Sequence, residues 1–323
     1  MDAISSILQE DGFCSFISVA ERHSIADLFT QNRRCGIYIL RFEDEMYYVG
    51  QAVDVVRRFT QHRKCHEDIN AIAFKFVSKP HLNQEENYFI GKLEQLCRLR
   101  NISLASLPHI LDSELDDLFP PEQQMIWLQL DNPVINIFSR VEDSALRDRT
   151  ALRYKKLLEK DSFKHAILPV LQEYIKTCIP EPYLTELTFW GCSCLPSYSN
   201  KNIVIYCRIN LRFQEVFTVG FDKQGRFPFF NWHVCKSLIP AECLQQICHK
   251  VTTLYVSEHI YPTGGVDQIN LGVESKEDAL ALLREKYFML SAKTFNLRCM
   301  RKGAQPYTST HCPALADSLL PSV

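Results

Sequence analysis

The sequence GIYILRFEDEMYYVG, residues 36–50, decides the fold of the N-terminal part of the chain. Residues 35–42 and 46–50 are rich in β-branched and aromatic side chains, and three acidic residues, Glu43 to Glu45, separate them. Two such runs around a short polar segment are typical of a β-hairpin. A similar run at 71–77 predicts a third strand.

The register of this hairpin decides which side chains meet. A three-residue loop would pair Phe42 with Met46. Tyr38 would then lie opposite Gly50, and the glycine would leave room beside the tyrosine ring. In this register Tyr38 and Tyr48 project from one face of the sheet as diagonal neighbours. A shift of one residue would put the two tyrosines on opposite faces.

A basic helix is expected directly after the hairpin. Asp54 is a suitable N-cap for residues 55–64, VVRRFTQHRK. Arg58 and His62 are four residues apart and therefore share a face of this helix. Three further cations extend its basic character: Arg57, Arg63 and Lys64. A guanidinium group suits phosphate because its planar donors can form two hydrogen bonds at once.

A second helix, predicted over 84–99 after the cap Asn83, carries a carboxylate on its apolar face. On a helical projection Glu86 lies within about 60° of four apolar positions, namely Phe89, Ile90, Leu93 and Cys97. A carboxylate on such a face needs a cation, a hydrogen-bond donor or a metal as its partner. Asn101 projects to the same side if the helix continues that far.

Five features in this order resemble the GIY-YIG nuclease superfamily. They are Gly36-Ile37-Tyr38, Tyr48-Val49-Gly50, Arg58-x3-His62, Glu86 in E-x3-I, and the trailing Asn101. The two tripeptides alone are a weak match because short patterns recur by chance, whereas all five on the expected strands and helices are specific. The resemblance covers under a third of the chain. It implies an α+β fold over residues 33–105, a small three-stranded sheet with flanking helices.

The resemblance also implies a reaction, because members of this superfamily hydrolyse phosphodiester bonds, usually in DNA, with one divalent metal. Glu86 would bind Mg²⁺ (or Mn²⁺), which takes few protein ligands. Tyr38 would be the general base or position the attacking water, and Tyr48 would assist it. Since a free tyrosine has a pKa of about 10, Arg58 and the metal would have to lower that value.

The remaining site residues would act on the substrate. Arg58 would stabilise the charge that develops on the phosphate, and His62 would position water or assist proton transfer. Asn101 would hydrogen-bond the substrate or orient the site. The substrate phosphates would contact the cations of the basic helix, which are Arg57, Arg58, Arg63 and Lys64.

Two features depart from the family pattern. Several members follow the second tripeptide with lysine, whereas this chain has Gln51, which puts phosphate contact or base activation from this position in doubt. In addition, only 28 positions separate Arg58 from Glu86, which is short for the family. An insertion that other members use for DNA contact would then be missing.

The rest of the chain predicts a second α+β region. Residues 1–32 are expected to be a helical extension, and the acidic segment 112–121, DSELDDLFPP, predicts a boundary. Residues 106–180 are expected to form a mainly helical connection, and residues 181–323 an α+β domain of unassigned role. The strands expected in this domain are 185–190, 202–211, 214–221, 227–232 and 251–256, and the helices are 240–250 and 276–289.

Composition sets limits on compartment and partner. With 36 Lys and Arg against 38 Asp and Glu, the net charge of −2 gives no global attraction to nucleic acid. No apolar run of about 18 residues is present, which argues against a membrane partner, and the N-terminus lacks the pattern of a signal peptide. The thirteen cysteines, an odd number without a CxxC pair, suit reduced thiols. We therefore expect a cytoplasmic protein.

Each motif also has a purely structural interpretation. The two tyrosines could be ordinary strand aromatics, and Asn83-x-x-Glu86 fits a capping box in which Glu86 only bonds the helix start. The segment 140–164 carries eight Lys and Arg against five Asp and Glu, and it is either a solvated helix face or a DNA contact. The concurrence of the tyrosines, the Arg58 face and Glu86 favours a functional site.

Three functions therefore stay open. The first is a metal-dependent DNA endonuclease in restriction, defence, homing or repair. The second is a catalytically idle module that binds nucleic acid or protein, with function in the C-terminal region, and Gln51 favours it slightly. The third is a zinc-bearing interaction protein, whose ligands would be drawn from Cys192, Cys194, Cys243, Cys248 and His249.

Overall fold

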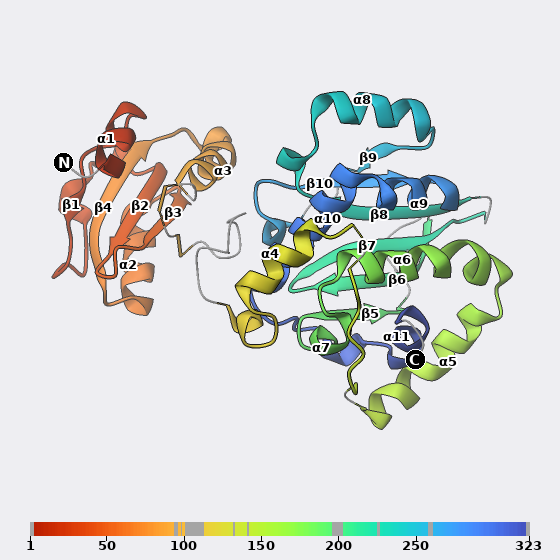
Figure 1. The fold of residues 1–323 in the computed structure, drawn as a ribbon. Coiled ribbons are helices and arrows are strands. Elements are labelled where there is room, and N and C mark those ends of the chain that lie inside the picture. Colours follow the sequence, from red (N-terminus) through yellow and green to blue (C-terminus); the bar gives the residue numbers. More distant parts are fainter. Residues whose placement is uncertain are drawn as a thin grey trace. The chain divides into compact units, whose positions relative to one another are not determined.

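A computed structural model describes residues 3–93, 96–97, 99–100, 113–131, 133–140, 142–195, 203–224, 227–257 and 261–320. The chain divides into two compact units, Met1–Leu111 (unit 1) and Asp112–Val323 (unit 2). Each combines helices with an antiparallel sheet (Figure 1), which confirms the expected α+β class. Within the described ranges, no helix is both long and apolar enough to cross a membrane.

Unit 1 is built on one antiparallel sheet with the strand order β1-β4-β2-β3. Its elements are α1 (Ala3–Glu10), β1 (Ile17–Ser18), β2 (Gly36–Phe42), β3 (Tyr47–Ala52), α2 (Val55–Cys65), β4 (Ile69–Phe76) and α3 (Leu82–Leu93). The sheet has a fourth strand beyond the expected three because Ile17 and Ser18 pair with β4. The expected helical extension therefore begins as a helix but contributes an edge strand to the sheet.

Different helices cover the two faces of this sheet. Successive side chains of a strand point to opposite faces, so neighbouring residues enter different clusters. One face buries Ile37, Ile39 and Val49 in a cluster with residues of α1 and α3. The opposite face buries Tyr38 and Leu40 together with residues of α2. The first tripeptide therefore presents its tyrosine to the basic helix, while α3 lies on the other side of the sheet.

Unit 2 contains a six-stranded antiparallel sheet with the order β5-β6-β7-β8-β10-β9. Its strands are β5 (Trp190–Ser193), β6 (Ile203–Leu211), β7 (Gln214–Asp222), β8 (Pro228–Val234), β9 (Tyr255–Ser257) and β10 (Ile269–Val273). Its helices are α4 (Pro121–Gln129), α5 (Ser144–Leu158), α6 (Leu168–Cys178), α7 (Pro182–Thr185), α8 (Ala241–Lys250), α9 (Lys276–Arg284), α10 (Lys286–Arg301) and α11 (Pro313–Leu319). This unit takes in both the described part of 112–180 and the region that follows.

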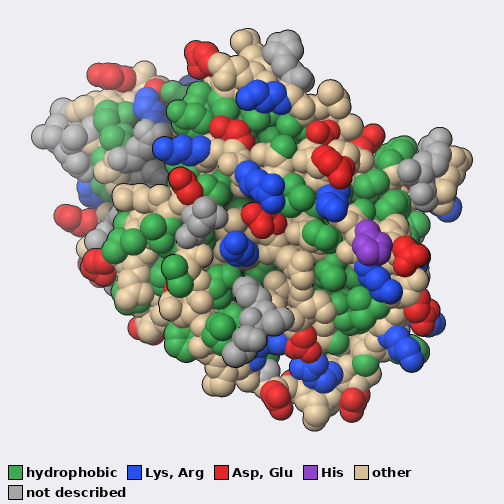
Figure 2. Space-filling view, turned by 45° about the vertical axis from the view of Figure 1, so that its right-hand side comes forward, with side chains coloured by type: hydrophobic (Ala, Val, Ile, Leu, Met, Phe, Trp, Pro, Cys, Tyr) green, Lys and Arg blue, Asp and Glu red, His purple; other side chains and the backbone are tan. Residues whose placement is uncertain are grey.

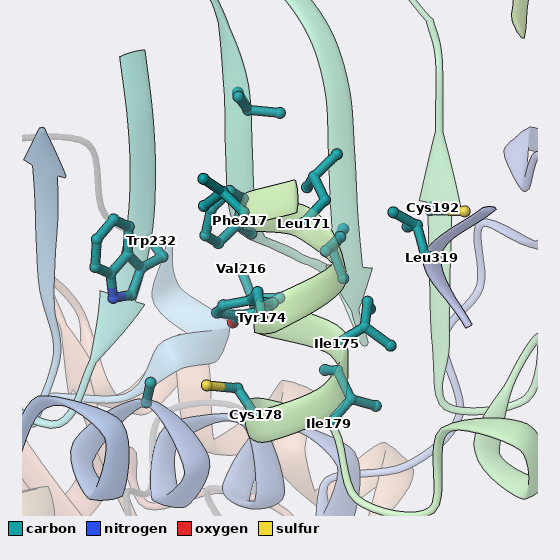
Figure 3. Packing of buried hydrophobic residues seen from close by; sticks show 14 of the residues in the cluster. Leu171, Tyr174, Ile175, Cys178, Ile179, Cys192, Val216, Phe217, Trp232 and Leu319 are labelled. Atoms are coloured by element: carbon teal, nitrogen blue, oxygen red, sulfur yellow. The ribbon is translucent and has the colours of Figure 1, made fainter. Parts of the chain in front are cut away.

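Helix α6 provides the centre of the core of unit 2 (Figure 3). Tyr174 lies against Phe217 of β7, with ring centroids 4.5 Å apart, and Phe217 stacks on Trp232 of β8 at 5.6 Å. Ile175 and Cys178 are fully buried in the same cluster. Aromatic pairs of this kind add stability beyond the apolar area that they bury.

Several C-terminal elements differ from the sequence-based prediction. The segment predicted as strand 185–190 contains the end of α7 and only the first residue of β5, and β10 is not among the predicted strands. The single helix predicted over 276–289 is two helices, α9 and α10. The break lies at Glu285, whose carboxylate accepts hydrogen bonds from the backbone N–H groups of Tyr287 and Phe288 and so caps α10.

Candidate functional site

The hairpin has the register that brings the two tyrosines together. Tyr38 pairs with Gly50 across β2 and β3, and the Phe42 N–H donates to the Met46 carbonyl at 2.9 Å to close the loop. The rings of Tyr38 and Tyr48 lie beside each other, with centroids 6.2 Å apart and an angle of 29° between their planes. Tyr38 is buried and Tyr48 is half-buried. The prediction that both project from one face is confirmed.

Gly50 is required by this arrangement. A Cβ atom at this position would lie 2.4 Å from both Cζ and Oη of Tyr38, and 2.8 Å from Cε1 of Tyr48. These distances are far shorter than van der Waals contact, so any side chain at position 50 would displace the tyrosine rings. The glycine of the second tripeptide thus makes room for the tyrosine of the first, as the register argument predicts.

Helix α2 brings a histidine and an arginine to the tyrosines. Asp54 caps the helix as predicted, since its side chain accepts from the backbone N–H groups of Val56 and Arg57. His62 Nε2 lies 2.8 Å from the Tyr38 hydroxyl, in a hydrogen bond whose direction depends on the histidine tautomer. Arg58, one turn earlier, keeps its guanidinium at the surface and beside the phenol groups.

Glu86 reaches the same place from α3, at the edge strand of the sheet. Its Oε1 accepts from the backbone N–H of Gln51 at 3.1 Å, and its Oε2 accepts from Gln51 Nε2 at 2.9 Å. The Gln51 amide also donates to Asn83 Oδ1 at 2.6 Å. These hydrogen bonds point to β3, not to the start of α3, so the capping-box interpretation of Glu86 is wrong.

Gln51 and Asn83 are members of the site that sequence reasoning did not assign to it. Gln51 stands out in the sequence only as a departure from the lysine of the family, and Asn83 only as a helix cap. In the structure α3 begins at Leu82, so Asn83 lies in its first turn and accepts from Gln51 instead. Adjacency to the second tripeptide is the only sequence signal for Gln51.

The protonation states of the site follow from burial. Burial is the main reason that the pKa of Tyr38 and that of Tyr48 lie above their ordinary value, although the Arg58 charge opposes the shift. Burial and the Arg58 charge lower the pKa of His62 to about 4. At neutral pH both phenols are therefore protonated and the imidazole is neutral. Arg58 alone does not lower the pKa of Tyr38 below the free value, because burial outweighs this cation.

The carboxyl group of Glu86 is subject to the same competition. Its half-burial raises its pKa, while the two hydrogen bonds from Gln51 and the Arg58 charge act in the opposite direction. A carboxylate has about four lone-pair positions, and the hydrogen bonds from Gln51 occupy two of them. The remaining positions are available to a cation or to water.

The four cations of α2 do not form one surface. Arg57, Arg58 and Lys64 are exposed. Arg63 is buried, and its guanidinium donates to four backbone carbonyls, those of Val19, Arg22, Glu67 and Ile69. The prediction that Arg63 contacts phosphate is therefore wrong, because its side chain joins the N-terminal segment and the start of β4 to α2.

No ready-made metal cage exists in the part of the chain that the structure describes. There, no three His, Cys, Asp or Glu side chains come together as metal ligands. Cys192 and Cys194 are buried free thiols, and burial raises the pKa of Cys192 well above its ordinary value. The side chains of Cys248 and His249 lie outside the described residues, and so does Asn101. Among the described residues, Glu86 is the carboxylate whose charge acts on both tyrosines, and it could share a cation with water and substrate.

The structure thus gathers Tyr38, Tyr48, Arg58, His62 and Glu86 around the β3 edge of the sheet of unit 1. Comparison with known proteins adds no further identification. No protein-family model matches the chain, no curated protein matches it, and no solved structure matches it.

Proposed function

We propose that unit 1 is a divalent-metal-dependent endonuclease domain that hydrolyses phosphodiester bonds in DNA. The observation that carries the proposal is the convergence of two phenols, an imidazole, a guanidinium and a carboxylate from four separate elements, β2, β3, α2 and α3. A packing role alone does not require such a set, because each of these groups costs free energy to desolvate.

The guanidinium of Arg58 is the group suited to the scissile phosphate. It is exposed, and it lies beside the hydroxyls of Tyr38 and Tyr48. A planar cation at this point can donate two hydrogen bonds to phosphate oxygens and stabilise the charge that builds up on them. Arg57 and Lys64 are also exposed on α2, where they can contact neighbouring phosphates.

The protonation states favour a positioning role for Tyr38. Without a bound metal its hydroxyl keeps its proton at neutral pH, and this state suits the orientation of a water molecule or a phosphate oxygen through hydrogen bonds. The neutral imidazole of His62, 2.8 Å from that hydroxyl, offers a lone pair for a proton in one of its tautomers. Tyr38 and His62 thus form a hydrogen-bonded pair that can relay or orient a proton.

Glu86 is the residue that would hold the metal. Its carboxylate is fixed by Gln51 yet keeps lone pairs free. Mg²⁺ commonly binds through one or two carboxylates, with waters and substrate phosphates completing its shell, so a single carboxylate fits that ion better than it fits zinc. When bound, the ion would supply Lewis-acid stabilisation of the phosphate.

An activity screen tests this proposal. The full chain is incubated with plasmid, linear, branched and single-stranded DNA, and with RNA, in Mg²⁺ and in Mn²⁺. We expect DNA nicking that falls at least about 100-fold in Tyr38→Phe, the size typical for the loss of a positioned catalytic hydroxyl. The matched control is Tyr88→Phe, because Tyr88 is exposed on α3. Equal cleavage by the two variants would remove Tyr38 from the mechanism.

A catalytically idle binding module is the second candidate, and Gln51 is the observation that favours it. Gln51 donates to both oxygens of Glu86, so each oxygen has a hydrogen-bond partner without a metal. A metal titration separates the two functions. An endonuclease should gain thermal stability with rising Mg²⁺ or Mn²⁺, because a ligand that binds the folded state stabilises it, and this gain should vanish in Glu86→Gln. An idle module should show neither effect.

A further inference from the structure

A small basic pocket lies in unit 2, in a part of the chain that the proposed nuclease site does not use. It has a volume of about 250 Å³ and is formed by α5, by the segment after β5 and by the turn before α11. Its lining residues are Arg149, Thr150, Arg153, Cys194, Leu195, Ser309 and Thr310. Among these described residues are two cations and no carboxylate.

The two arginines share one side of α5. Arg149 and Arg153 are four residues apart, so their side chains leave the helix in nearly the same direction. Like charges at this spacing repel each other by a few tenths of a kcal/mol. Both side chains are exposed at the pocket. A bound anion would turn this repulsion into attraction.

Most other described arginines of unit 2 pair with a carboxylate, whereas these two have no acidic partner among the described residues. Arg140 pairs with Glu186 and Asp317, and Arg147 pairs with Asp317. Further pairs are Arg208 with Glu215, Arg298 with Asp267 and Arg301 with Asp116. Among the described residues, no carboxylate forms a salt bridge with Arg149 or Arg153. Their charge is therefore available to a ligand.

The opposite wall of the pocket is polar and is held in place by one of the arginines. Arg149 donates to the carbonyl of Ser309 at 2.5 Å, which ties the turn Thr308–Thr310 to α5. Ser309 and Thr310 of this turn line the pocket, and the Thr310 hydroxyl donates to the Tyr307 carbonyl at 2.9 Å, which holds the turn in shape. Two arginines at a small cavity with a polar wall are suited to a tetrahedral oxyanion, because a guanidinium can donate two hydrogen bonds to one phosphate.

We propose that this pocket binds a phosphate group, with Arg153 as the main contact and Arg149 as a contact that also shapes the wall. The phosphate could belong to a nucleic-acid backbone or to a small phosphate monoester, since the donors are the same for both. Lys156 follows on α5, seven residues after Arg149, and is also exposed. A backbone that leaves the pocket along α5 would meet this third cation.

Calorimetric titration with inorganic phosphate tests the binding site itself. The full chain, Arg153→Ala and Arg149→Ala/Arg153→Ala are compared with Lys155→Ala, an exposed lysine on the far side of the same helix. We expect phosphate binding to weaken at least about tenfold in the double variant, as for the loss of charge-assisted hydrogen bonds, and to change less than about twofold in Lys155→Ala. Arg153→Lys separates charge from geometry, because lysine keeps the charge but loses the planar donors.

Binding to a DNA duplex tells the two sources of phosphate apart. In the Glu86→Gln background, where the proposed cleavage is absent, the slope of log K against log salt should become shallower by about 0.9 for each lost phosphate contact if the backbone enters the pocket. An unchanged slope with weakened inorganic-phosphate binding assigns the pocket to a small phosphate ester. The proposal is overturned if the double variant changes neither measurement. These measurements do not require cleavage, so failure of the nuclease proposal leaves them intact.

Discussion

Gln51 stands where several members of the resembled family have lysine, and its neutral side chain is a hydrogen-bond donor to Glu86. The same side chain links that carboxylate to Asn83. A lysine at this position would bring a positive charge close to any cation bound at Glu86. The neutral amide orients the carboxylate without that repulsion, which is the reason we place Gln51 in the site.

Replacing Gln51 tests this orientation. Gln51→Met keeps the length of the side chain but removes the amide donor, while the backbone N–H still reaches Glu86. We expect the metal concentration for half-maximal cleavage to rise about tenfold, since a hydrogen bond to a charged group contributes about 1.5–3 kcal/mol. The matched control is Gln84→Met, an exposed position on α3. An unchanged metal requirement in Gln51→Met would show that the amide does not position Glu86.

His62 makes stability depend on pH in a window that can be stated. Its pKa is about 4 in the folded protein, against an ordinary 6.5. Between these values the unfolded chain binds a proton that the folded protein does not, so stability falls as pH falls from about 6.5 towards 4. We expect the free energy of unfolding of the wild type, measured in urea, to decrease relative to that of His62→Gln as the pH is lowered from 7 to 4.5. A difference that stays constant would contradict the lowered pKa.

At the residue scale, local spacing was sufficient to find most of the site. Tyr38, Tyr48, Arg58 and His62 come from a hairpin and one following helix, so periods of two and of about four residues predict their faces. The protonation states could not be predicted, because they depend on burial by distant segments. The partners of Gln51 and Arg63 depend on tertiary packing for the same reason.

Helix α2 serves two purposes, because Arg58 and Arg63 have different surroundings. One face carries Arg58 and His62 to the tyrosines. The side chain of Arg63 instead enters the protein and donates to carbonyls at the start of β4 and in the N-terminal segment. This buried guanidinium replaces the hydrogen bonds that these backbone groups would otherwise make with water.

The structural role of Arg63 predicts a large loss of stability on its removal. Arg63→Ala leaves several carbonyls without a donor. We expect the free energy of unfolding, measured by urea denaturation, to be about 3–5 kcal/mol lower than in the wild type. Arg57→Ala, on the exposed side of α2, should change that free energy by less than about 0.5 kcal/mol. If the two variants were equally stable, Arg63 would be a surface cation after all.

Elements with strong local signals were predicted best. The hairpin, α2, β6, β7 and β8 lie within a few residues of their predicted bounds, because turns, caps and β-branched runs bound them. The strand Ile17–Ser18 is too short to show a pattern and exists only because β4 offers it a partner. The apolar periodicity continues from α9 into α10. The break between them depends on the carboxylate of Glu285, which caps α10, so the periodicity alone does not predict it.

On the scale of the whole molecule, charge is balanced rather than absent. Lys and Arg side chains are interspersed with Asp and Glu over the face shown in Figure 2, in keeping with the net charge of −2. Such a surface offers few sites for counterion release, so attraction to DNA would come from local cations such as those on α2 and at the pocket beside α5. Near-neutrality is therefore compatible with a nucleic-acid partner but predicts weak binding away from the site.

The most direct measurement of the central claim is plasmid cleavage by two neighbouring variants of α3. Glu86 accepts a hydrogen bond from Gln51 and lies near the tyrosines. The preceding residue, Glu85, instead forms an ion pair with Lys75 of β4, at 2.7 Å. With Mg²⁺ or Mn²⁺ we expect the wild type and Glu85→Gln to nick DNA at rates within about twofold of each other, and Glu86→Gln to be slower by at least about 100-fold. Metal-dependent cleavage that persists in Glu86→Gln, or its absence from the wild type on every DNA substrate, would contradict this account.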